Sequence, residues 1–182
     1  GGTGDDVVIM DAEDNLSNVS GGAGFDVLMF EDTVGLTLDL AGKDFEVAIG
    51  GSGADSLMFT GASQVLLAGG GGNDTLQGDI GADRLEGDEG ADLLLGGAGD
   101  DLLVGGAGAD TLVGGTGDDV LVADAEDLTM GSVSGGDGAD ILMIDGTVGV
   151  TATASTLGVE EIAGGLGGDY LAVGIDGVGR RL

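Results

Sequence analysis

Six nonapeptides follow one another without a gap from residue 69 to residue 122: GGGGNDTLQ, GDIGADRLE, GDEGADLLL, GGAGDDLLV, GGAGADTLV and GGTGDDVLV. Each has Gly at places one and four, Asp at place six and Leu at place eight. Five more copies begin at residues 1, 21, 50, 135 and 164, with Val or Leu at place eight. Only Asp79 and Asp88 interrupt the Gly at place two. This strict spacing argues against a solvated acidic linker and predicts a repeat architecture.

The composition excludes an ordinary globular domain and several kinds of partner. The 182 residues include 43 Gly and no Pro, and 34 acidic residues face only 4 basic ones, for a net charge of −30. Such a charge repels nucleic acid and anionic lipid. No apolar run approaches the roughly 20 residues that a membrane-spanning helix needs, so we expect no membrane insertion. The natural counterion is a cation.

The repeats form a central block between two similar arms. Residues 69–122 are the block, and residues 1–68 and 115–182 are duplicated arms, because GTGDDVVIMDAED at residue 2 aligns with GTGDDVLVADAED at residue 115. In each arm the last two repeats start 29 residues apart, and we interpret the spacers as calcium-poor half-turns of the same coil. Residues 61–67 and 124–130 are interpreted as half-turns that have lost their ligand positions. Helical periodicity is absent, so we expect almost no helix. We interpret residues 1–182 as a single unit, which is a segment of a longer protein.

The order of residues within a repeat predicts a coil. Gly at places one, two and four permits the positive φ angles of a tight bend, and places seven to nine predict a very short strand. Side chains alternate along a strand, so place eight points inward while places seven and nine point outward. Two nonapeptides then make one 18-residue turn of an all-β solenoid. Its thin core consists of two columns, Leu76, Leu94, Leu112 and Leu85, Leu103, Leu121.

The sixth-place Asp residues predict a metal requirement. Stacked turns lie about 4.8 Å apart, which places Asp74, Asp92 and Asp110 on one edge and Asp83, Asp101 and Asp119 on the other. Like charges at that spacing repel, and a hard divalent cation between successive loops reverses the sign of the interaction. Carboxylate and carbonyl oxygens suit Ca²⁺. Zinc favours His or Cys, and the sequence has neither.

The nonapeptide resembles the repeats-in-toxin (RTX), haemolysin-type calcium-binding β-roll, a right-handed parallel β-roll with Ca²⁺ as its cofactor. The resemblance implies that each calcium ion lies between two loops. One loop offers it the carbonyl oxygens of places one and three, and the facing loop offers those of places two and four. Both loops also offer their sixth-place Asp. Carried over to four pairs of loops, the ligands are Gly69, Gly71, Asp74, Asp88, Gly90 and Asp92; Gly78, Ile80, Asp83, Gly97, Gly99 and Asp101; Gly87, Glu89, Asp92, Gly106, Gly108 and Asp110; and Gly96, Ala98, Asp101, Gly115, Gly117 and Asp119.

The spacing of the remaining Asp residues predicts which others share an ion. Asp6 with Asp26, Asp55 with Asp74, and Asp119 with Asp140 lie 19 to 21 residues apart, so each pair needs a bulge in the half-turn between its members. Asp26 with Asp55 and Asp140 with Asp169 lie one and a half turns apart and should share none. Asp88 stands where the motif has Gly, and it either strains its loop or adds an oxygen ligand.

The function expected from the sequence is structural rather than enzymatic. Acidic pairs such as Asp100 and Asp101 arise automatically from the repeat, so they are weak evidence for a glycosidase. The RTX resemblance implies a module of a bacterial protein that is exported unfolded by type I secretion machinery and folds on meeting extracellular calcium, at the cell surface or beyond it.

Outward apolar residues provide an alternative to that function. An exposed apolar patch on a sheet face usually marks an interaction site. The partner would be either a covering segment of the longer protein, or another copy of the chain or a surface, as in an adhesin. The outward residues that suggest the patch are Leu93, Leu95, Leu102, Val104, Val113, Val120 and Val122.

Overall fold

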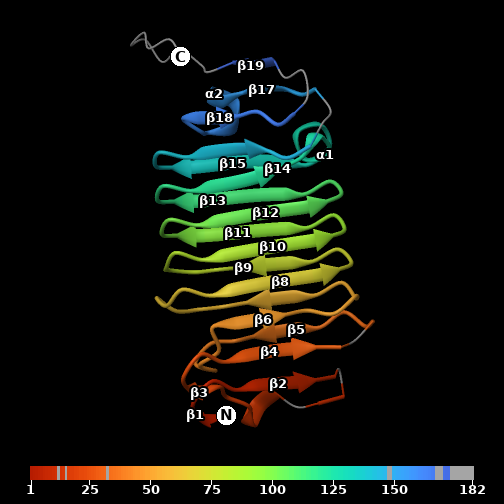
Figure 1. The fold of residues 1–182 in the computed structure, drawn as a ribbon, viewed down its shortest axis with the longest axis vertical. Coiled ribbons are helices and arrows are strands. Elements are labelled where there is room, and N and C mark those ends of the chain that lie inside the picture. The colour runs from red at the N-terminus through yellow and green to blue at the C-terminus, as the bar shows by residue number, and fades with distance from the viewer. Residues whose placement is uncertain (12, 15, 32, 147–148, 167–169, 173–182) are drawn as a thin grey trace.

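The chain forms a parallel β-solenoid that winds from the N-terminus at one end to the C-terminal strands at the other (Figure 1). The structure is a computed structural model and describes residues 1–11, 13–14, 16–31, 33–146, 149–166 and 170–172. All strand pairs among these residues are parallel. The predicted all-β parallel β-roll is therefore confirmed.

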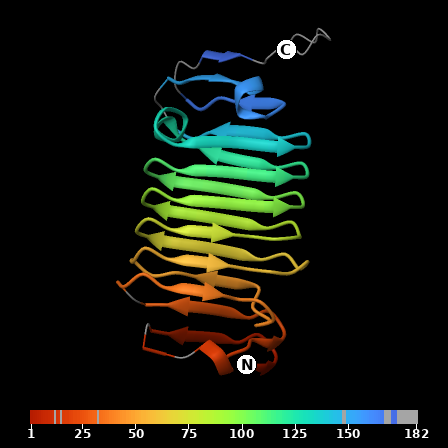
Figure 2. The same cartoon turned by 180° about the vertical axis from the view of Figure 1, so that it is seen from behind.

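Two sheets lie back to back, and their strands run in opposite directions across the molecule (Figures 1 and 2). The nine-stranded sheet 1 contains β2 (Val7–Met10), β4 (Val27–Phe30), β6 (Val47–Ile49), β8 (Leu66–Gly71), β10 (Arg84–Glu89), β12 (Leu102–Ala107), β14 (Val120–Ala123), β16 (Ile141–Ile144) and β18 (Glu161–Ala163). The six-stranded sheet 2 contains β5 (Thr37–Asp39), β7 (Ser56–Met58), β9 (Thr75–Gln77), β11 (Leu93–Ala98), β13 (Thr111–Thr116) and β15 (Ser132–Asp137). Two small sheets pair β1 (Gly2–Thr3) with β3 (Gly22–Ala23) and β17 (Thr151–Thr153) with β19 (Tyr170–Ala172).

The core is the pair of columns that the eighth place predicts. Leu85 pairs with Leu103 and Leu103 with Leu121 in sheet 1, while Leu94 pairs with both Leu76 and Leu112 in sheet 2. All six side chains are fully buried. The arms extend the columns with aliphatic residues and add Phe30, Phe45 and Phe59 where their loops differ from the nonapeptide. One buried Leu per half-turn gives a core only one side chain thick from each sheet.

The strands of the central block are longer than the three residues expected from the sequence. The strands β10 to β13 each cover six residues, because pairing continues through the first three places of the following repeat. Glycine at places two and four does adopt positive φ, as at Gly97 (115°) and Gly99 (128°). Place one does not, so the prediction of a positive φ there is wrong. A side chain at place one is excluded for a different reason, which concerns the Asp ladder.

Helix is confined to three short segments among the described residues. They are a 3₁₀ turn at Leu16–Asn18, α1 (Ala125–Thr129) and α2 (Ala154–Leu157), in agreement with the expected near absence of helix. Neither α-helix has the length or the hydrophobicity to cross a membrane. The spacers continue the coil: β5 and β6 lie in the first, and β17 and β18 lie in the second.

Candidate metal-binding edges

The loops between the two sheets form two edges of the solenoid. Edge 1 is defined by the loops that lead into sheet 1, and edge 2 by those that lead into sheet 2. In most turns the residue directly before the strand is an acidic residue. From the N-terminus, this position holds Asp6, Asp26, Glu46, Val65, Asp83, Asp101, Asp119, Asp140 and Glu160 on edge 1, and Leu36, Asp55, Asp74, Asp92, Asp110 and Gly131 on edge 2, where Asp127 supplies the last carboxylate from α1.

Hydrogen bonds join neighbouring carboxylates into ladders along both edges. On edge 1 the backbone N–H of Asp83 donates to Oδ1 of Asp101 at 2.8 Å, and that of Asp101 donates to Oδ1 of Asp119 at 2.8 Å. On edge 2 Asp74 and Asp92 donate in the same way to Asp92 and Asp110, at 2.7 and 2.8 Å. Each carboxylate is thus held by the turn before it, with 18 residues between partners in the central block.

The second oxygen of most ladder carboxylates has no protein partner. The side chains are at most 3 % exposed, yet Oδ2 accepts no hydrogen bond within the described structure. A buried anionic oxygen without a partner is costly, and native structures satisfy such groups with protein, water or an ion. The eight residues with this orphan Oδ2 are Asp26, Asp74, Asp83, Asp92, Asp101, Asp110, Asp119 and Asp140.

The first-place glycine leaves space next to each orphan oxygen. A Cβ on Gly96 would lie 2.6 Å from the carbonyl oxygen of Gly114 and still closer to Oδ2 of Asp101, and Gly78 has the same relation to Gly96 and Asp83. The sequence therefore keeps Gly at place one because a side chain would fill the gap between a carboxylate and a carbonyl oxygen. Hard oxygen donors of these two kinds are those that Ca²⁺ prefers. The donor set fits a calcium ion.

Burial shifts the acidity of the ladder. Desolvation raises the pKa of Asp74, Asp92, Asp101 and Asp119 to about 6, against the lowering effect of the backbone hydrogen bond. Ladder neighbours raise it further, since Asp101 lies between the charges of Asp119 and Asp83. The physical cause is the same at each: charged oxygens are removed from water and stacked on like charges. A bound divalent cation would reverse this electrostatic effect.

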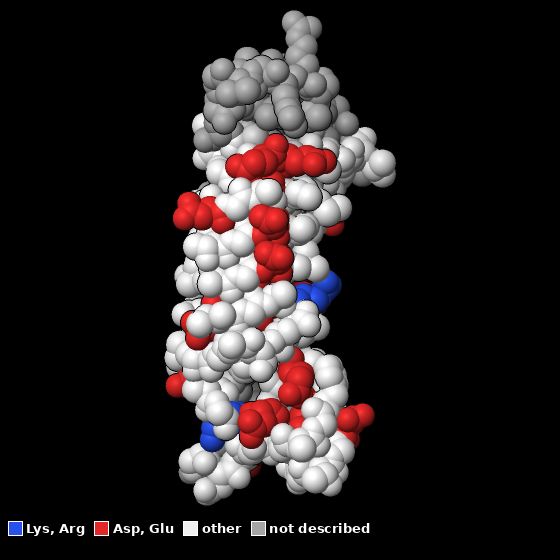
Figure 3. All heavy atoms as spheres, turned by 90° about the vertical axis from the view of Figure 1, so that its left-hand side faces the viewer, with Lys and Arg blue, Asp and Glu red and all other residues white. Residues whose placement is uncertain are grey.

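A second, solvent-exposed set of acidic residues follows edge 1. Figure 3 faces this edge and shows acidic side chains gathered in a column along the solenoid. Asp100 and Asp118, at place five, are exposed, and their Oδ1 atoms accept from the backbone N–H of Asp118 and Ala139, both at 2.9 Å. On edge 2 the fifth place holds Ala or Asn instead. The fifth place therefore adds surface negative charge to edge 1 in these repeats and none to edge 2.

The structure brings together the carboxylate pairs that the repeat spacing predicts. Besides the four pairs of the central block, Asp6, Asp55 and Asp119 donate to Oδ1 of Asp26, Asp74 and Asp140, at 2.8, 2.7 and 2.9 Å. Asp26 and Asp55 lie on opposite edges, so they cannot share an ion. Asp169, predicted not to pair with Asp140, lies outside the described residues.

The loop positions expected to supply carbonyl oxygens also stack in register. Gly97 pairs with Gly115, Asp88 pairs with Gly106, and Glu89 pairs with Ala107. The third-place carbonyls of Ala98 and Glu89 accept from the backbone N–H of Gly81 and Gly72, at 2.8 and 2.9 Å. The others of this set, Gly69, Gly71, Gly78, Ile80, Gly87, Gly90, Gly96, Gly99, Gly108 and Gly117, lie in the same loops, and Ile80 bridges to Ala98.

The backbone of Asp88 supports one of the two alternatives for this residue, which is strain in its loop. Its backbone adopts φ 72°, a left-handed conformation that Gly accepts at no cost and Asp tolerates better than most residues. The substitution therefore strains its loop. The neighbouring exception, Asp79, does not adopt a positive φ.

Three carboxylates outside the nonapeptide repeats complete the ladders, and the sequence pattern does not reveal them. Residues 124–130, interpreted as a half-turn without ligand positions, fold into α1 and present the fully buried Asp127, whose Oδ1 accepts from Asp110 N–H at 2.7 Å. Glu46 accepts from Asp26 N–H at 2.7 Å and Glu160 from Asp140 N–H at 2.7 Å. Each Glu lies directly before its strand, β6 or β18, at the position that Asp takes in the nonapeptide.

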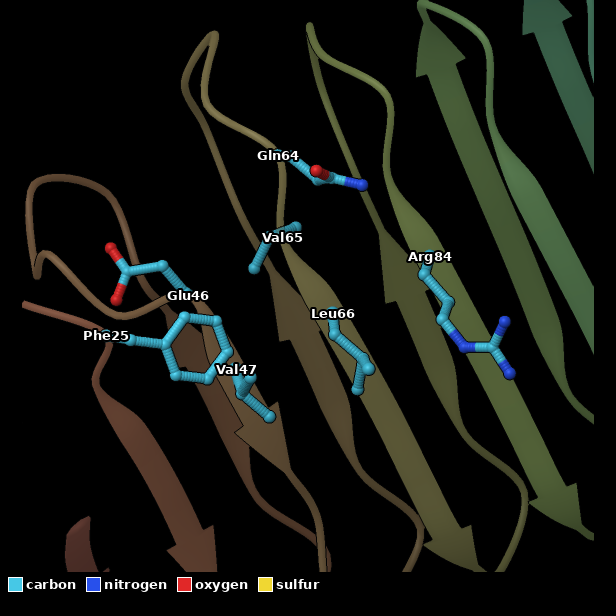
Figure 4. A pocket seen from close by; sticks show the side chains of 7 residues that line it. All are labelled: Phe25, Glu46, Val47, Gln64, Val65, Leu66 and Arg84. Carbon is cyan, nitrogen blue, oxygen red and sulfur yellow. The ribbon is translucent and has the colours of Figure 1, made fainter. Parts of the chain in front are cut away.

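Val65 interrupts the edge 1 ladder. Its backbone N–H still donates to Oδ1 of Asp83 at 2.9 Å, but its own side chain is apolar and buried with the core. Figure 4 shows Val65 beside a pocket that Phe25, Glu46, Val47, Gln64, Leu66 and Arg84 also line, with the Glu46 carboxylate directed away from Val65. Edge 1 thus has a short ladder that ends at Glu46 and a long one that begins at Asp83.

The outward apolar residues do not form one patch. Leu93, Leu95 and Val113 lie on sheet 2, whereas Leu102, Val104, Val120 and Val122 lie on sheet 1, so the single cluster inferred from the sequence is wrong. The reason is that consecutive repeats contribute alternately to the two sheets. On sheet 1 the apolar face continues into β16 with Ile141 and the exposed Met143. The ion pair of Arg84 with Glu86 on β10 interrupts it.

Comparison with known families agrees with this geometry. Residues 66–94 and 95–127 match the family model of the RTX calcium-binding nonapeptide repeat. A search of curated proteins found no match. Within the described part of the chain, no three acidic side chains converge as a metal cluster. The loop carbonyl oxygens beside the orphan Oδ2 atoms are further oxygen donors at both edges.

Proposed function

Because the central repeats of this chain belong to the RTX-type calcium-binding repeats, we propose that the whole segment is a calcium-dependent folding module, disordered without calcium and folded once calcium binds along both edges. The observation that carries the proposal is the set of eight buried Oδ2 atoms without a partner among the described residues. Without a cation, folding would bury these charges in stacks. With a cation between turns, the same stacks become the main source of stability.

The high Gly content and the net charge of −30 support the disordered calcium-free state. Gly loses more conformational freedom on folding than any other residue, and a large net charge destabilises the compact state through self-repulsion. Calcium is scarce in a cytosol and abundant outside cells. The module would thus remain unfolded during export by type I secretion machinery and fold in the extracellular space, as one part of a longer bacterial protein.

This role requires no catalysis by the segment. The matched repeats are calcium-binding, and Oδ1 of the ladder carboxylates in the central block holds adjacent turns together. We propose that any enzymatic or toxic activity belongs to other parts of the parent protein. The single unit over residues 1–182, with its central block and two arms, would act as one cooperative element because neighbouring turns share carboxylates.

A calcium titration followed by circular dichroism tests the proposal. We expect little strand signal in excess chelator and a cooperative rise over a narrow range of calcium concentration. Mg²⁺ is the control, because it demands octahedral geometry and gives up its water reluctantly. Full strand content in chelator, or an equal response to Mg²⁺, would contradict the proposal.

The outer face of sheet 1 supports a second candidate function, which is self-association or attachment to a surface. Leu102, Val104, Val120 and Val122 are half-buried and adjoin the exposed Met143 on three neighbouring strands. Light scattering in calcium, with the parent and the variant Val104→Lys plus Val122→Lys, tests this role. A parent that is monomeric at all concentrations excludes self-association, and loss of a dimer in the variant supports it.

A further inference from the structure

Each arm contains a loop that does not follow the nonapeptide but reproduces its ladder position. The first-arm loop leads into β6 and the second-arm loop into β18, and each has Glu directly before the strand. Glu46 accepts from the backbone N–H of Asp26, and Glu160 from that of Asp140, both at 2.7 Å and both across 20 residues. These contacts repeat the Asp-to-Asp contact of the central block.

The two loops also reproduce the space beside the orphan oxygen. A Cβ on Gly21 would lie 2.6 Å from Oδ2 of Asp26 and closer to the carbonyl oxygen of Asp44, and a Cβ on Gly135 would lie 2.5 Å from Oδ2 of Asp140 and closer to the carbonyl oxygen of Gly158. In the central block the corresponding carbonyl belongs to a first-place Gly.

The backbone that presents these carbonyls is alike in both arms. Asp44 and Gly158 each lie two residues before the Glu, and both adopt the left-handed conformation, with φ of 54° and 60°. A chain reversal of this kind, rather than a Gly-rich bend, brings the carbonyl oxygen and the carboxylate to the same edge. The sequences around them differ, since one loop contains a turn and the other contains α2.

The unsatisfied groups at these places require a ligand. Asp26 and Asp140 are fully buried, and in the described structure their Oδ2 atoms accept no hydrogen bond. Glu46 and Glu160 each accept the backbone N–H of the buried Asp, so two carboxylates come together at each of these loops and repel each other unless a cation lies between them.

We propose that Glu46 and Glu160 act as calcium ligands outside the nonapeptide motif, forming one site with Asp26 and one with Asp140 and ending the edge 1 ladders. The inference rests on the proposed calcium function. Asp127 differs from these residues because both of its oxygens accept backbone N–H groups, from Asp110 at 2.7 Å and from Asp124 at 2.8 Å.

Counting bound calcium separates this inference from the proposed function. The parent chain and the double variant Glu46→Gln plus Glu160→Gln are compared by equilibrium dialysis at saturating calcium. We expect the double variant to bind two ions fewer and each single variant to bind one fewer. The matched control is Glu13→Gln plus Glu161→Gln, which makes the same charge change at exposed residues and should keep the full count.

Each outcome is decisive. An unchanged count in the double variant overturns the role of the two glutamates and leaves the calcium module intact, whereas a parent that binds no calcium overturns both. Circular dichroism of the same samples shows whether each variant retains its strand content. If the double variant loses its strand content, the two single variants are compared instead. A single variant that stays folded and binds as many calcium ions as the parent chain overturns the inference.

Discussion

Oδ1 of Asp101 accepts the backbone N–H of Asp83 at 2.8 Å, while Oδ2 of the same carboxylate is buried without a partner in the described structure. One oxygen therefore holds the adjacent turn and the other is directed into the space that Gly96 leaves open. This division explains how a side chain can both stack the solenoid and offer a metal ligand. It also means that one substitution affects two neighbouring pairs of turns.

Replacing Asp101 by Ala should raise the calcium midpoint of folding by about tenfold or more. The change removes Oδ1, which accepts the backbone N–H of Asp83, and a hydrogen bond to a charged group contributes about 1.5–3 kcal/mol. It also removes Oδ2, the candidate ligand beside the Gly114 carbonyl oxygen, whereas the backbone N–H that donates to Asp119 is kept. Asp145→Ala is the control, because that side chain is exposed and outside the ladders. A circular-dichroism titration that gives equal midpoints for the two variants would refute the ladder as the origin of calcium dependence.

Gly96→Ala should weaken folding although φ at Gly96 is not positive. The new Cβ would lie 2.6 Å from the Gly114 carbonyl oxygen and nearer still to Oδ2 of Asp101, so the loop must shift, at a cost of about 1–3 kcal/mol typical of overpacking. Gly71→Ala is the matched control, since its Cβ would make only an ordinary contact with Ser52 at 3.7 Å. Urea denaturation at saturating calcium measures both. Equal losses would show that the space beside the carboxylate is not critical.

Acid should stabilise the calcium-free coil. Burial raises the pKa of Asp74, Asp92, Asp101, Asp119 and Asp127 to about 6, so the folded state binds more protons than the unfolded state between about pH 4 and pH 6. The free energy of unfolding therefore decreases as the pH rises through this window, and the stabilisation is lost above pH 6.

We expect more strand signal in chelator at pH 5 than at pH 7, and a higher calcium midpoint at pH 5 because protons compete for the same oxygens. Both are measured by circular dichroism at fixed ionic strength. A calcium midpoint that does not change between the two pH values would show that the buried carboxylates do not bind the ion.

Asp127→Ala should reduce stability without reducing the number of bound ions. Both oxygens of Asp127 accept backbone N–H groups, from Asp110 at 2.7 Å and from Asp124 at 2.8 Å, and the second contact belongs to the capping box of α1. Each buried donor left unsatisfied costs about 1–3 kcal/mol. The expected result is a lower urea midpoint at saturating calcium with an unchanged ion count by equilibrium dialysis. Loss of an ion would instead make Asp127 a ligand.

The features that depend only on the order of residues within the nonapeptide could be predicted from the sequence. The inward Leu columns, the alternation of repeats between two sheets and the pairs such as Asp74 with Asp92 follow from an 18-residue period. The purpose of the first-place Gly was not predictable, because the clash that excludes a side chain at Gly96 involves Gly114 on the next turn. The extent of the strands was also missed, since the pairing of Asp88 with Gly106 forms only when turns stack.

A strict repeat places the same residue type at the same height in every turn, so the repeat alone predicts a parallel coil with two acidic edges. Where the ladders end and break depends on how the turns pack. A helix brings Asp127 to edge 2, and left-handed turns bring Glu46 and Glu160 to edge 1. Val65 interrupts the ladder of edge 1, and the sequence of its own loop does not predict this gap. The physical reason is that a ladder position depends on the register between turns, and outside the exact repeat that register is set by how each spacer packs on its neighbours.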